Sequence, residues 1–322
     1  MSEKSDQAYL SVLIPVYNEE ESLSELGEEV SSVLSGLGMT SEVVLVDDGS
    51  TDGSFRAIQD LCKRHPGFKG VRLGRNVGQT GALAAAIKHA SGELIACLDA
   101  DMQNDARDIP RLIDKLNEGY DVVSGWRKHR RDAFLNRKLP SMLANGLISR
   151  ITGVPLHDYG CTLKLYRAKY LKPLRLYGEM HRFVPAFAGF LGARITELPV
   201  NHRPRLKGHS KYGIMRTFKV LLDLLTVKFM DAYMAKPIYL FGGSGFVMGL
   251  LGAAMAAVTL YKKLALGIFV KDQPLFQVSI FFSLIGFQLI MIGLLAEILI
   301  RVYFDIKDKP SYFVRETVGF AQ

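Results

Sequence analysis

Two acidic residues stand two positions apart in the segment LDADMQ, residues 98–103, directly after an apolar run. Side chains at positions i and i+2 of a strand share one face, so Asp99 and Asp101 are expected to point together beyond the strand end. Paired carboxylates, together with the amide oxygen of Gln103, suit a hard cation that prefers oxygen ligands, such as Mg²⁺ or Mn²⁺. The segment therefore predicts a divalent metal site that neutralises a diphosphate as it leaves.

Two other predicted strands also end in residues that suit a nucleotide. The run VVLVDDGSTD, residues 43–52, contains Asp47 and Asp48 before a Gly-Ser turn, and the run IPVYNEEES, residues 14–22, contains Tyr17 and Glu19. The Tyr17 ring can lie against a base, and carboxylates at Glu19 and Asp48 can accept hydrogen bonds from a base or a ribose. An aspartate in such a turn can instead cap the next helix, and the sequence leaves both interpretations open.

The elements that must position these residues alternate along the first 200 residues. Short apolar runs predict strands at 9–18, 41–50, 69–76, 93–101, 120–126 and 193–200, and helical patterns lie at 20–37, 54–64, 80–90 and 106–118. Strands that alternate with helices and are apolar along most of their length predict an α/β domain with a mainly parallel sheet covered on both faces. Ligands of such folds bind at the C-terminal ends of the strands, where the acidic residues are expected.

Two long uncharged runs follow, of 24 residues at 237–260 and of 23 residues at 274–296. At about 1.5 Å per residue the first run is roughly 36 Å long, against roughly 30 Å for a bilayer hydrocarbon core. Helices buried in a soluble core are the alternative, but such helices usually keep a polar face. Small residues recur at every fourth position from Gly245 to Ala257, which permits close helix approach within a hairpin or between subunits of a homo-oligomer.

Basic residues beside these runs predict their orientation. Twelve Lys and Arg residues lie outside the two runs, in 201–236 and in the tail, against three in the loop that connects them. This bias predicts a multi-pass membrane protein with the α/β domain and both termini in the cytoplasm. A basic amphipathic pattern at 213–234 predicts an interfacial helix, and residues 134–150 are a weaker candidate. The expected parts are 1–212 for the α/β domain, 213–236 for the interfacial region, 237–303 for two membrane helices (about 237–260 and 275–300) and 304–322 for a cytoplasmic tail.

The overall composition excludes several classes of protein. The 322 residues are 48% hydrophobic and 22% charged, with a mean hydropathy of +0.13, which excludes a disordered chain. The net charge of +8 indicates an anionic partner, but the cations flank the apolar runs and no aromatic and basic platform for single strands is evident, so nucleic acid is not expected. Three widely separated cysteines argue against a disulfide framework or a CxxC zinc site, and no cleaved signal peptide is expected at the N-terminus.

The motifs IPVYNEEESL, VVLVDDGSTD, RNVGQTGALAAA, LDADMQND and GYDVVSGWR occur in this order, followed by HDYGCTLKLYR, HSKYGIMR and the two apolar runs. In this combination the chain resembles glycosyltransferase family 2 with its Rossmann-like GT-A fold, in the branch that acts on polyisoprenyl phosphates. The resemblance covers essentially the whole chain. It implies a nucleotide sugar as donor, undecaprenyl phosphate or a similar polyprenyl phosphate as acceptor, and Mg²⁺ or Mn²⁺ as cofactor. It also implies a location in the inner membrane and a role in the cell envelope, such as lipopolysaccharide synthesis.

The resemblance also assigns site residues. It implies contacts with the donor at Pro15, Tyr17, Glu19, Val46, Asp48, Asp99 and Ala100, and metal ligands at Asp99, Asp101 and Gln103. It implies catalytic roles for Asp101, Asp158 and Arg127, contacts with the acceptor phosphate at Arg127 and Arg137, and a basic loop over the donor with Arg203, Arg205 and Lys211. Relatives often have Arg where this chain has Lys164, so Lys164 receives no role, and Met102 is expected to point away from the metal.

The expected reaction is an inverting sugar transfer that needs no strong base, because a lipid phosphate is already an anion at neutral pH. Residues 127–138, with six Lys and Arg, are expected to hold the two anionic substrates together or else to form a solvated loop. UDP-glucose is the expected donor, with the 4-deoxy-4-formamido-L-arabinose donor and GDP-mannose as alternatives. A processive polysaccharide synthase is disfavoured because the sole tryptophan, Trp126, is not part of a QxxRW motif. A non-catalytic, membrane-anchored nucleotide-binding scaffold is the remaining alternative.

Overall fold

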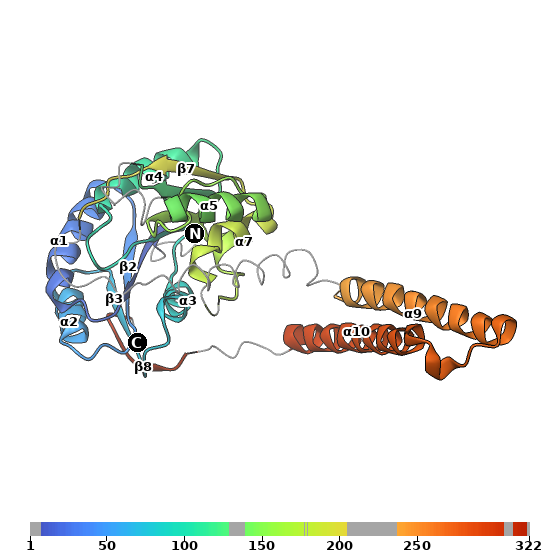
Figure 1. Ribbon diagram of the computed structural model, residues 1–322. Coiled ribbons are helices and arrows are strands. Elements are labelled where there is room, and N and C mark those ends of the chain that lie inside the picture. Colours follow the sequence, from blue (N-terminus) through green and yellow to red (C-terminus); the bar gives the residue numbers. More distant parts are fainter. Residues whose placement is uncertain are drawn as a thin grey trace, which may run out of the picture. The chain divides into compact units, whose positions relative to one another are not determined.

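The computed structural model describes residues 8–128, 139–176, 178, 180–204, 237–305 and 312–320. The chain divides into two compact units, one formed by Met1–Leu225 with Pro310–Gln322 and the other by Thr226–Lys309. Several residues to which the sequence assigned roles lie outside the described residues, namely Arg137, Arg205, Lys211 and the interfacial segment 213–236. Each unit is described by itself below (Figure 1).

The first unit alternates strands and helices along most of its length. Its strands are β1 (Leu10–Val16), β2 (Ser41–Asp47), β3 (Phe68–Leu73), β4 (Leu94–Cys97), β5 (Val122–Trp126), β6 (Lys164–Arg167), β7 (Ile195–Pro199) and β8 (Val314–Val318). Its α-helices are α1 (Glu20–Gly36), α2 (Ser54–Arg64), α3 (Gln79–His89), α4 (Ile109–Asn117), α5 (Leu139–Thr152), α6 (Ala168–Leu171) and α7 (Val184–Phe190). Short 3-10 turns η1 (Ala106–Asp108) and η3 (Met180–Arg182) precede α4 and α7.

In the described residues the eight strands form one sheet in the order β7-β5-β6-β4-β1-β2-β3-β8. The central strands β4, β1, β2 and β3 run parallel, whereas β6 is antiparallel to both β4 and β5. β7 pairs parallel with β5, and β8 pairs antiparallel with β3. The sequence prediction of a mainly parallel α/β sheet is confirmed, and the C-terminal ends of β1, β2 and β4 lie at one edge of it.

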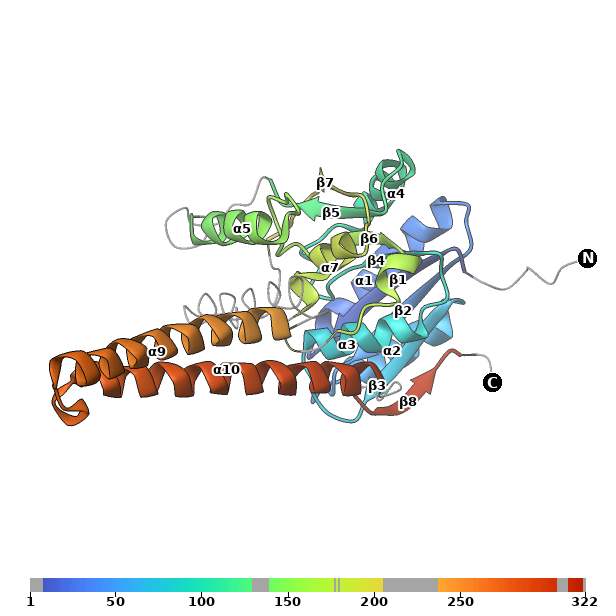
Figure 2. The ribbon, with the colours of Figure 1, turned by 90° about the vertical axis from the view of Figure 1, so that its right-hand side faces the viewer.

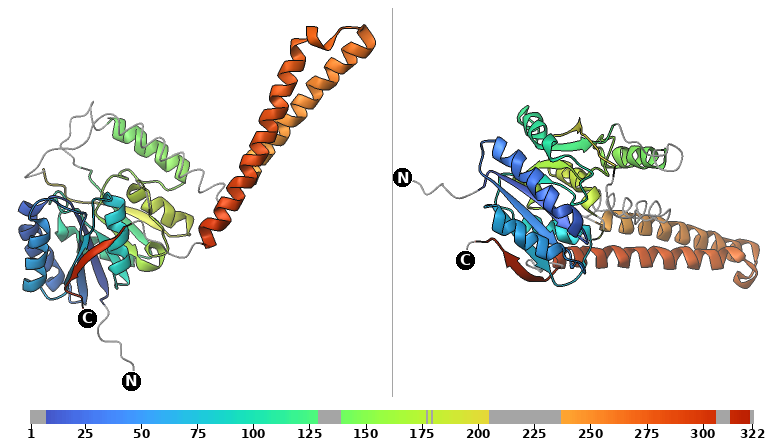
Figure 3. Two further views of the ribbon diagram at one scale, coloured as in Figure 1. Left: turned by 90° about the horizontal axis from the view of Figure 1, so that it is seen from below. Right: turned by 90° about the vertical axis from the view of Figure 1, so that its left-hand side faces the viewer.

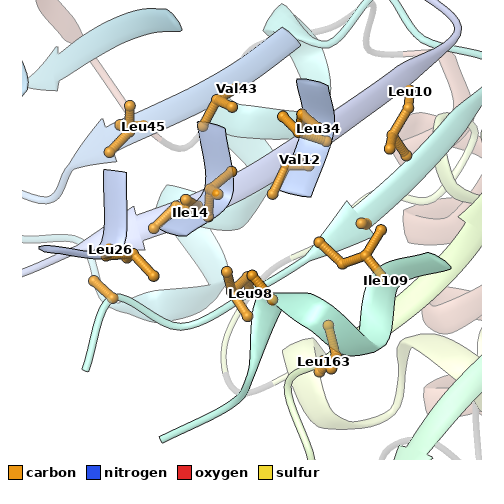
Figure 4. Close-up of a cluster of buried hydrophobic side chains, with 14 of the residues drawn as sticks. Leu10, Val12, Ile14, Leu26, Leu34, Val43, Leu45, Leu98, Ile109 and Leu163 are labelled. Carbon is orange, nitrogen blue, oxygen red and sulfur yellow. The ribbon is translucent and has the colours of Figure 1, made fainter. Parts of the chain in front are cut away.

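Helices cover both faces of this sheet. On one face α1, α2 and α4 bury apolar stripes with helical spacing, for example Ile109, Leu112 and Leu116 of α4. These stripes form one hydrophobic cluster with strand residues such as Val12 and Ile14 (Figure 4). On the other face α3 packs against β1 and β2 through a row of small alanines. These two layers fix the positions of the strand ends.

The sequence did not predict β8, which follows the apolar runs and pairs with the edge strand β3 (Figure 3). Val314 is paired with Leu73 and Val318 with Gly70, and the Gly74 amide donates to the carbonyl of Phe313 over 2.9 Å. Gly319 has a φ of +78° and lies so close to the Phe68 carbonyl that a β-carbon would be 2.4 Å from that oxygen. The C-terminal residues that the structure describes thus belong to the sheet of the α/β unit.

The second unit is an antiparallel pair of long helices, α9 (Ile238–Leu266) and α10 (Pro274–Asp305), joined through the turn η4 (Val270–Asp272) (Figure 2). By length and composition two helices of the described chain could cross a membrane, Ile238–Leu266 and Pro274–Leu299. Close packing occurs where Gly245 meets Gly286 and where Gly252 meets Ser283. Ala257, at the end of the predicted small-residue stripe, is exposed, so the contact stripe follows positions 245, 249 and 252 instead.

Candidate active site

The acidic segment after β4 lies beside the ends of β1 and β2 because β4, β1 and β2 are neighbours in the sheet. β4 ends at Cys97, and Leu98 continues the pairing by donating its amide to the Leu13 carbonyl. Asp99 and Asp101 follow directly, both partly exposed, at the edge where ligands of open α/β sheets bind. The structure therefore brings the two predicted metal-binding carboxylates to the predicted edge.

Asp99 is held by two side chains from other parts of the chain. Its Oδ1 accepts a hydrogen bond from Gln79 Nε2 over 3.0 Å, and its Oδ2 accepts one from the Thr162 hydroxyl over 2.8 Å. The Thr162 oxygen in turn accepts from Asn104 Nδ2 over 2.7 Å. Burial and the neighbouring Asp101 carboxylate raise the pKa of Asp99 to about 6, although the Thr162 hydrogen bond and nearby cations oppose this shift. Two carboxylates so close together call for a compensating positive charge.

The backbone conformation at Met102 explains how this tight turn is made. Met102 has a φ of +56°, in the left-handed region that costs a non-glycine residue about 1–2 kcal/mol. Its side chain is buried in the hydrophobic core, so it does point away from the site. The Gln103 amide donates to Asp101 Oδ1 over 3.2 Å and closes the turn.

The ligand set offered here matches a divalent cation of the Mg²⁺ or Mn²⁺ type. The metal-binding atoms that the side chains of Asp99, Asp101 and Gln103 can offer are carboxylate and amide oxygens, which such ions prefer. The described residues contain no cluster of three or more His, Cys, Asp or Glu side chains able to enclose a metal. An ion at this site would therefore take several ligands from water or from a substrate, as Mg²⁺ commonly does beside phosphates.

Arg127, the residue after β5, forms a two-pronged ion pair with Asp158. Its Nε donates to Asp158 Oδ2 over 2.7 Å and its Nη2 donates to Oδ1 over 2.9 Å. The Gly160 amide also donates to Oδ1 over 3.1 Å. Both oxygens of Asp158 are thus engaged and the carboxylate is buried, whereas Arg127 keeps Nη1 outside this pair. The predicted catalytic residues Arg127 and Asp158 are brought together, and Arg127 also lies near enough to Asp99 to lower its pKa.

The ends of β1 and β2 lie next to the acidic segment. Pro15 of β1 is the register partner of Val46 of β2, and Tyr17 beyond β1 has an exposed fraction of 38%. Glu19 lies two residues further, directly before α1, and its amide donates to the Ser54 hydroxyl over 2.9 Å. An exposed ring beside two adjacent strand ends is compatible with the predicted contact with a nucleotide base.

At the second strand end, Asp48 contacts the loop that precedes α3. Its two carboxylate oxygens accept from the backbone amides of Val77 and Gly78 over 2.8 and 2.9 Å, at the start of α3. Burial raises the pKa of Asp48, and these two hydrogen bonds oppose that shift. Both amides precede Gln79, the first residue of α3, so the carboxylate holds the loop before that helix, and its contact with a base or a ribose stays a prediction.

Two further predicted donor-binding residues make contacts within the protein. The Arg203 guanidinium pairs with Glu29 over 2.7 Å and with Asp105 over 2.8 Å, while its amide donates to the Gln103 carbonyl over 2.8 Å. A donor contact by this guanidinium would require these ion pairs to open. Ala100 is buried, and its carbonyl accepts a hydrogen bond from the Ser22 hydroxyl over 2.8 Å. This contact ties the acidic segment to α1.

Sequence reasoning missed Gln79, Thr162 and Asn104, the side chains that fix Asp99. Each is a neutral polar residue, and Thr162 is 63 positions from Asp99, so no spacing pattern links them. The one available signal was their place in the segments RNVGQTG, LDADMQND and DYGCT, which also supply Asp99 and Asp158. Together these groups can bind a cation and a diphosphate, and they place a positively charged side chain beside that site for a second anion.

Comparison with known proteins gives the following similarities. A family model described as "Glycosyl transferase family 2" matches residues 11–175. The chain is 43% identical over 311 residues to a dodecaprenyl-phosphate galacturonate synthase of Rhizobium johnstonii, covering 95% of this chain and 92% of the relative. It is 38% identical over 321 residues to an undecaprenyl-phosphate 4-deoxy-4-formamido-L-arabinose transferase of Edwardsiella ictaluri, covering 99% and 97%. The fold is similar to that of glucosyl-3-phosphoglycerate synthase from Mycobacterium tuberculosis, solved with Mn²⁺, UDP and phosphoglyceric acid, with a TM-score of 0.54, 16% identity and coverage of 70% and 78%.

Proposed function

Because this chain belongs to glycosyl transferase family 2 and is a glycosyltransferase of its polyprenyl-phosphate branch, we propose that it transfers a sugar from a nucleotide donor to undecaprenyl phosphate or a similar lipid. The observation that supports this most directly is the placement of Asp99 and Asp101 beside the Arg127–Asp158 pair. The first pair of residues suits a metal-bound diphosphate, and Arg127 suits a second anion. The two long apolar helices suit a lipid substrate that stays in the membrane.

The donor would bind over the ends of β1 and β2, with its base near Tyr17 and its diphosphate near Asp101. Asp99, Asp101 and Gln103 would hold Mg²⁺ or Mn²⁺, which supplies positive charge to the departing diphosphate. Gln79 and Thr162 keep the Asp99 carboxylate in place before any ligand arrives, so little reorganisation is needed on binding.

The acceptor would approach through its phosphate, which is already an anion at neutral pH. Arg127 would bind this phosphate through Nη1, the guanidinium nitrogen outside its pair with Asp158. Asp158 would then act as a positioning residue, because both of its oxygens are occupied by the arginine. Direct attack by a phosphate oxygen on the anomeric carbon would invert the configuration of the transferred sugar.

The relatives bear on the choice of donor. The sequence favoured UDP-glucose, but the two relatives named above carry galacturonate and 4-deoxy-4-formamido-L-arabinose in their names. These two sugars share the galacto arrangement at C2, C3 and C4, whereas glucose has the opposite configuration at C4. We therefore propose a donor with the galacto arrangement in place of UDP-glucose, and GDP-mannose becomes a distant alternative.

Membrane topology also belongs to this proposal. The twelve Lys and Arg residues that flank the two uncharged runs, against three in the loop that connects them, favour a hairpin whose two termini are both cytoplasmic, which leaves the catalytic unit on the side that holds nucleotide sugars. Single cysteines placed at Lys262 and Lys271, near the connecting loop, should react with an impermeant thiol reagent in intact spheroplasts. Labelling of these positions only after cell lysis would contradict the proposed orientation.

The deciding experiment uses the purified full chain with undecaprenyl phosphate, Mn²⁺ and a panel of UDP-galacturonate, UDP-4-deoxy-4-formamido-L-arabinose, UDP-galactose, UDP-glucose and GDP-mannose. Mass spectrometry of the organic phase identifies the product. We expect a glycosyl-phosphate lipid from a galacto-configured donor, and loss of at least about 1,000-fold in turnover with EDTA or in Asp101→Asn. Turnover from UDP-glucose alone would refute the proposed donor, and full activity of Asp101→Asn would refute the metal site.

A further inference from the structure

Lys164 is a buried cation to which the proposed function assigns no role. It is the first residue of β6, paired in register with Cys97 of β4 and Ser124 of β5, and its exposed fraction is only 4%. Burial lowers the pKa of its ammonium group. An apolar side chain would be the less costly choice at a buried strand position, so the presence of a lysine calls for an explanation.

The contacts of the Lys164 ammonium supply that explanation. Its Nζ donates to the carbonyl oxygen of Tyr159 over 3.2 Å and also to the carbonyl oxygen of Cys161. Both carbonyls belong to the loop 158–162, so the lysine lies behind this loop and ties it to β6. Buried carbonyls without a donor are costly, and an apolar side chain at position 164 would leave these two unpaired.

Both ends of this loop reach into the candidate active site. At its start, Asp158 holds Arg127 through two hydrogen bonds of 2.7 and 2.9 Å. At its end, Thr162 donates to Asp99 over 2.8 Å. A shift of the loop by even about 1 Å would break the geometry of both contacts, because hydrogen bonds weaken steeply outside their normal range.

We propose that Lys164 is a positioning residue for the transfer reaction, which acts through the carbonyls of residues 159 and 161 to fix the loop that orients both Arg127 and Asp99. It touches neither substrate. Its positive charge also offsets part of the negative charge of Asp99 and Asp158, which lie at the same site. This inference rests on the proposed roles of Arg127 and Asp158 in binding the acceptor phosphate.

The test compares Lys164→Met, which removes both hydrogen bonds and the charge, with Lys164→Arg, which retains donors and charge. We expect Lys164→Met to lower kcat/KM for undecaprenyl phosphate about 30-fold, mainly by raising KM, and to raise the half-saturating Mn²⁺ concentration. Lys164→Arg should stay within about 3-fold of the unaltered chain, because a guanidinium can serve both carbonyls. If Lys164→Met only produced a misfolded fraction, kcat alone would fall, and the half-saturating concentrations of undecaprenyl phosphate and Mn²⁺ would stay unchanged. That result would overturn the proposal.

Lys69→Met is the matched control. Lys69 pairs with the buried Glu42 over 2.6 Å and packs at 5.3 Å from the Phe320 ring, among contacts that do not involve the acidic segment. Its replacement should lower the melting temperature and leave both half-saturating concentrations unchanged. If Lys69→Met changes them as much as Lys164→Met does, a general loss of stability explains the effect and the proposal fails.

A double-mutant cycle with Asp158→Asn separates this inference from the proposed function. If Lys164 acts through the loop, its replacement should cost less than about 3-fold once Asp158 no longer holds Arg127 firmly. A cost of about 30-fold in both backgrounds would overturn the role of Lys164 while leaving the proposed function intact. Full activity of Asp158→Asn alone would instead refute the proposed site. If Lys164→Met does not fold, the same cycle is run with two other variants. Thr162→Val takes the place of Lys164→Met. Lys164→Gln, whose amide donates two hydrogen bonds without a charge, takes the place of Lys164→Arg.

Discussion

The carboxylate of Asp99 should destabilise the metal-free protein, and Asp99→Asn measures by how much. Its pKa of about 6 lies above the 3.8 of an unperturbed aspartate, because burial and Asp101 disfavour the charged form. At pH 8 both the folded and the unfolded chain carry this charge, so the folded state bears its full cost. Asparagine removes the charge and keeps nearly the same shape.

The expected change in the free energy of unfolding follows from the pKa shift of Asp99 and from its hydrogen bonds with Gln79 and Thr162. About two pKa units correspond to about 3 kcal/mol at 1.4 kcal/mol per unit. The asparagine oxygen can still accept from Gln79, and its amide can donate to the Thr162 oxygen, but the Thr162 hydroxyl then loses its acceptor, at a cost of about 1 kcal/mol. The net gain in the free energy of unfolding is therefore about 2 kcal/mol, or about 4–8 °C in Tm for a domain of this size.

Thermal unfolding in detergent with EDTA, followed at pH 8 and at pH 4.5, tests this prediction. A raised folded-state pKa means that the folded chain binds more protons between about pH 4 and 6, so the unaltered protein gains stability as the pH falls through 6. Asp99→Asn should thus be more stable at pH 8, nearly equal near pH 4, and inactive in transfer. A variant that is less stable than the unaltered chain at pH 8, or whose difference does not change with pH, would refute the reasoning.

Other parts of the fold give three further predictions. Glu42→Gln should change the free energy of unfolding in the opposite direction to Asp99→Asn. Burial raises the pKa of Glu42, but its hydrogen bonds, first that from Lys69, outweigh burial and lower the pKa overall. The carboxylate therefore stabilises the fold above about pH 4.5, and this stabilisation is lost as the pH falls. Thermal unfolding at pH 7 should show a loss of about 2 kcal/mol that shrinks as the pH falls below 4.5, and a loss independent of pH would contradict it. Gly286→Leu should separate the two long helices, because a β-carbon there would lie 2.6 Å from the Gly245 carbonyl. The separation would be measured as the loss of a disulfide engineered across the helix pair, and Ala257→Leu, at an exposed position, is the neutral control. Ending the chain after residue 311 removes β8, the partner of the edge strand β3. This truncation should lower the Tm of the α/β unit by several degrees, while the affinity for UDP stays within about 2-fold. An unchanged Tm would mean that β8 adds no stability.

Local patterns predicted the elements whose signals are contained in a few neighbouring residues. The stripe of Ile109, Leu112 and Leu116 and the apolar runs of β1 and β2 fold as their periodicity indicates, because burial on one face decides their structure. The segment LDADMQ lies at the C-terminal edge of the sheet for the same reason: it directly follows a buried strand.

Contacts between distant segments could not be read from such patterns. β8 carries the charged residues Arg315 and Glu316 and lacks an apolar run, and it becomes a strand only because the edge of β3 offers hydrogen bonds some 240 positions earlier. β6 has only four residues and begins with Lys164, which no scale of β-propensity favours. The bond from Thr162 to Asp99 depends on β6 being placed beside β4, so it follows from the topology and not from spacing.

The contacts of Asp158 also bear on which acceptors the site can use. A general base must take a proton from its substrate, and a carboxylate does this best when it is not already paired with a strong cation. Asp158 gives both oxygens to Arg127, so deprotonating a sugar hydroxyl would first require this pair to open. A phosphate needs no such step, since at neutral pH it already carries the negative charge that attacks the anomeric carbon. The buried pair thus favours a phosphate acceptor over the growing sugar chain of a polymerase, and it favours it through residues of the α/β unit alone.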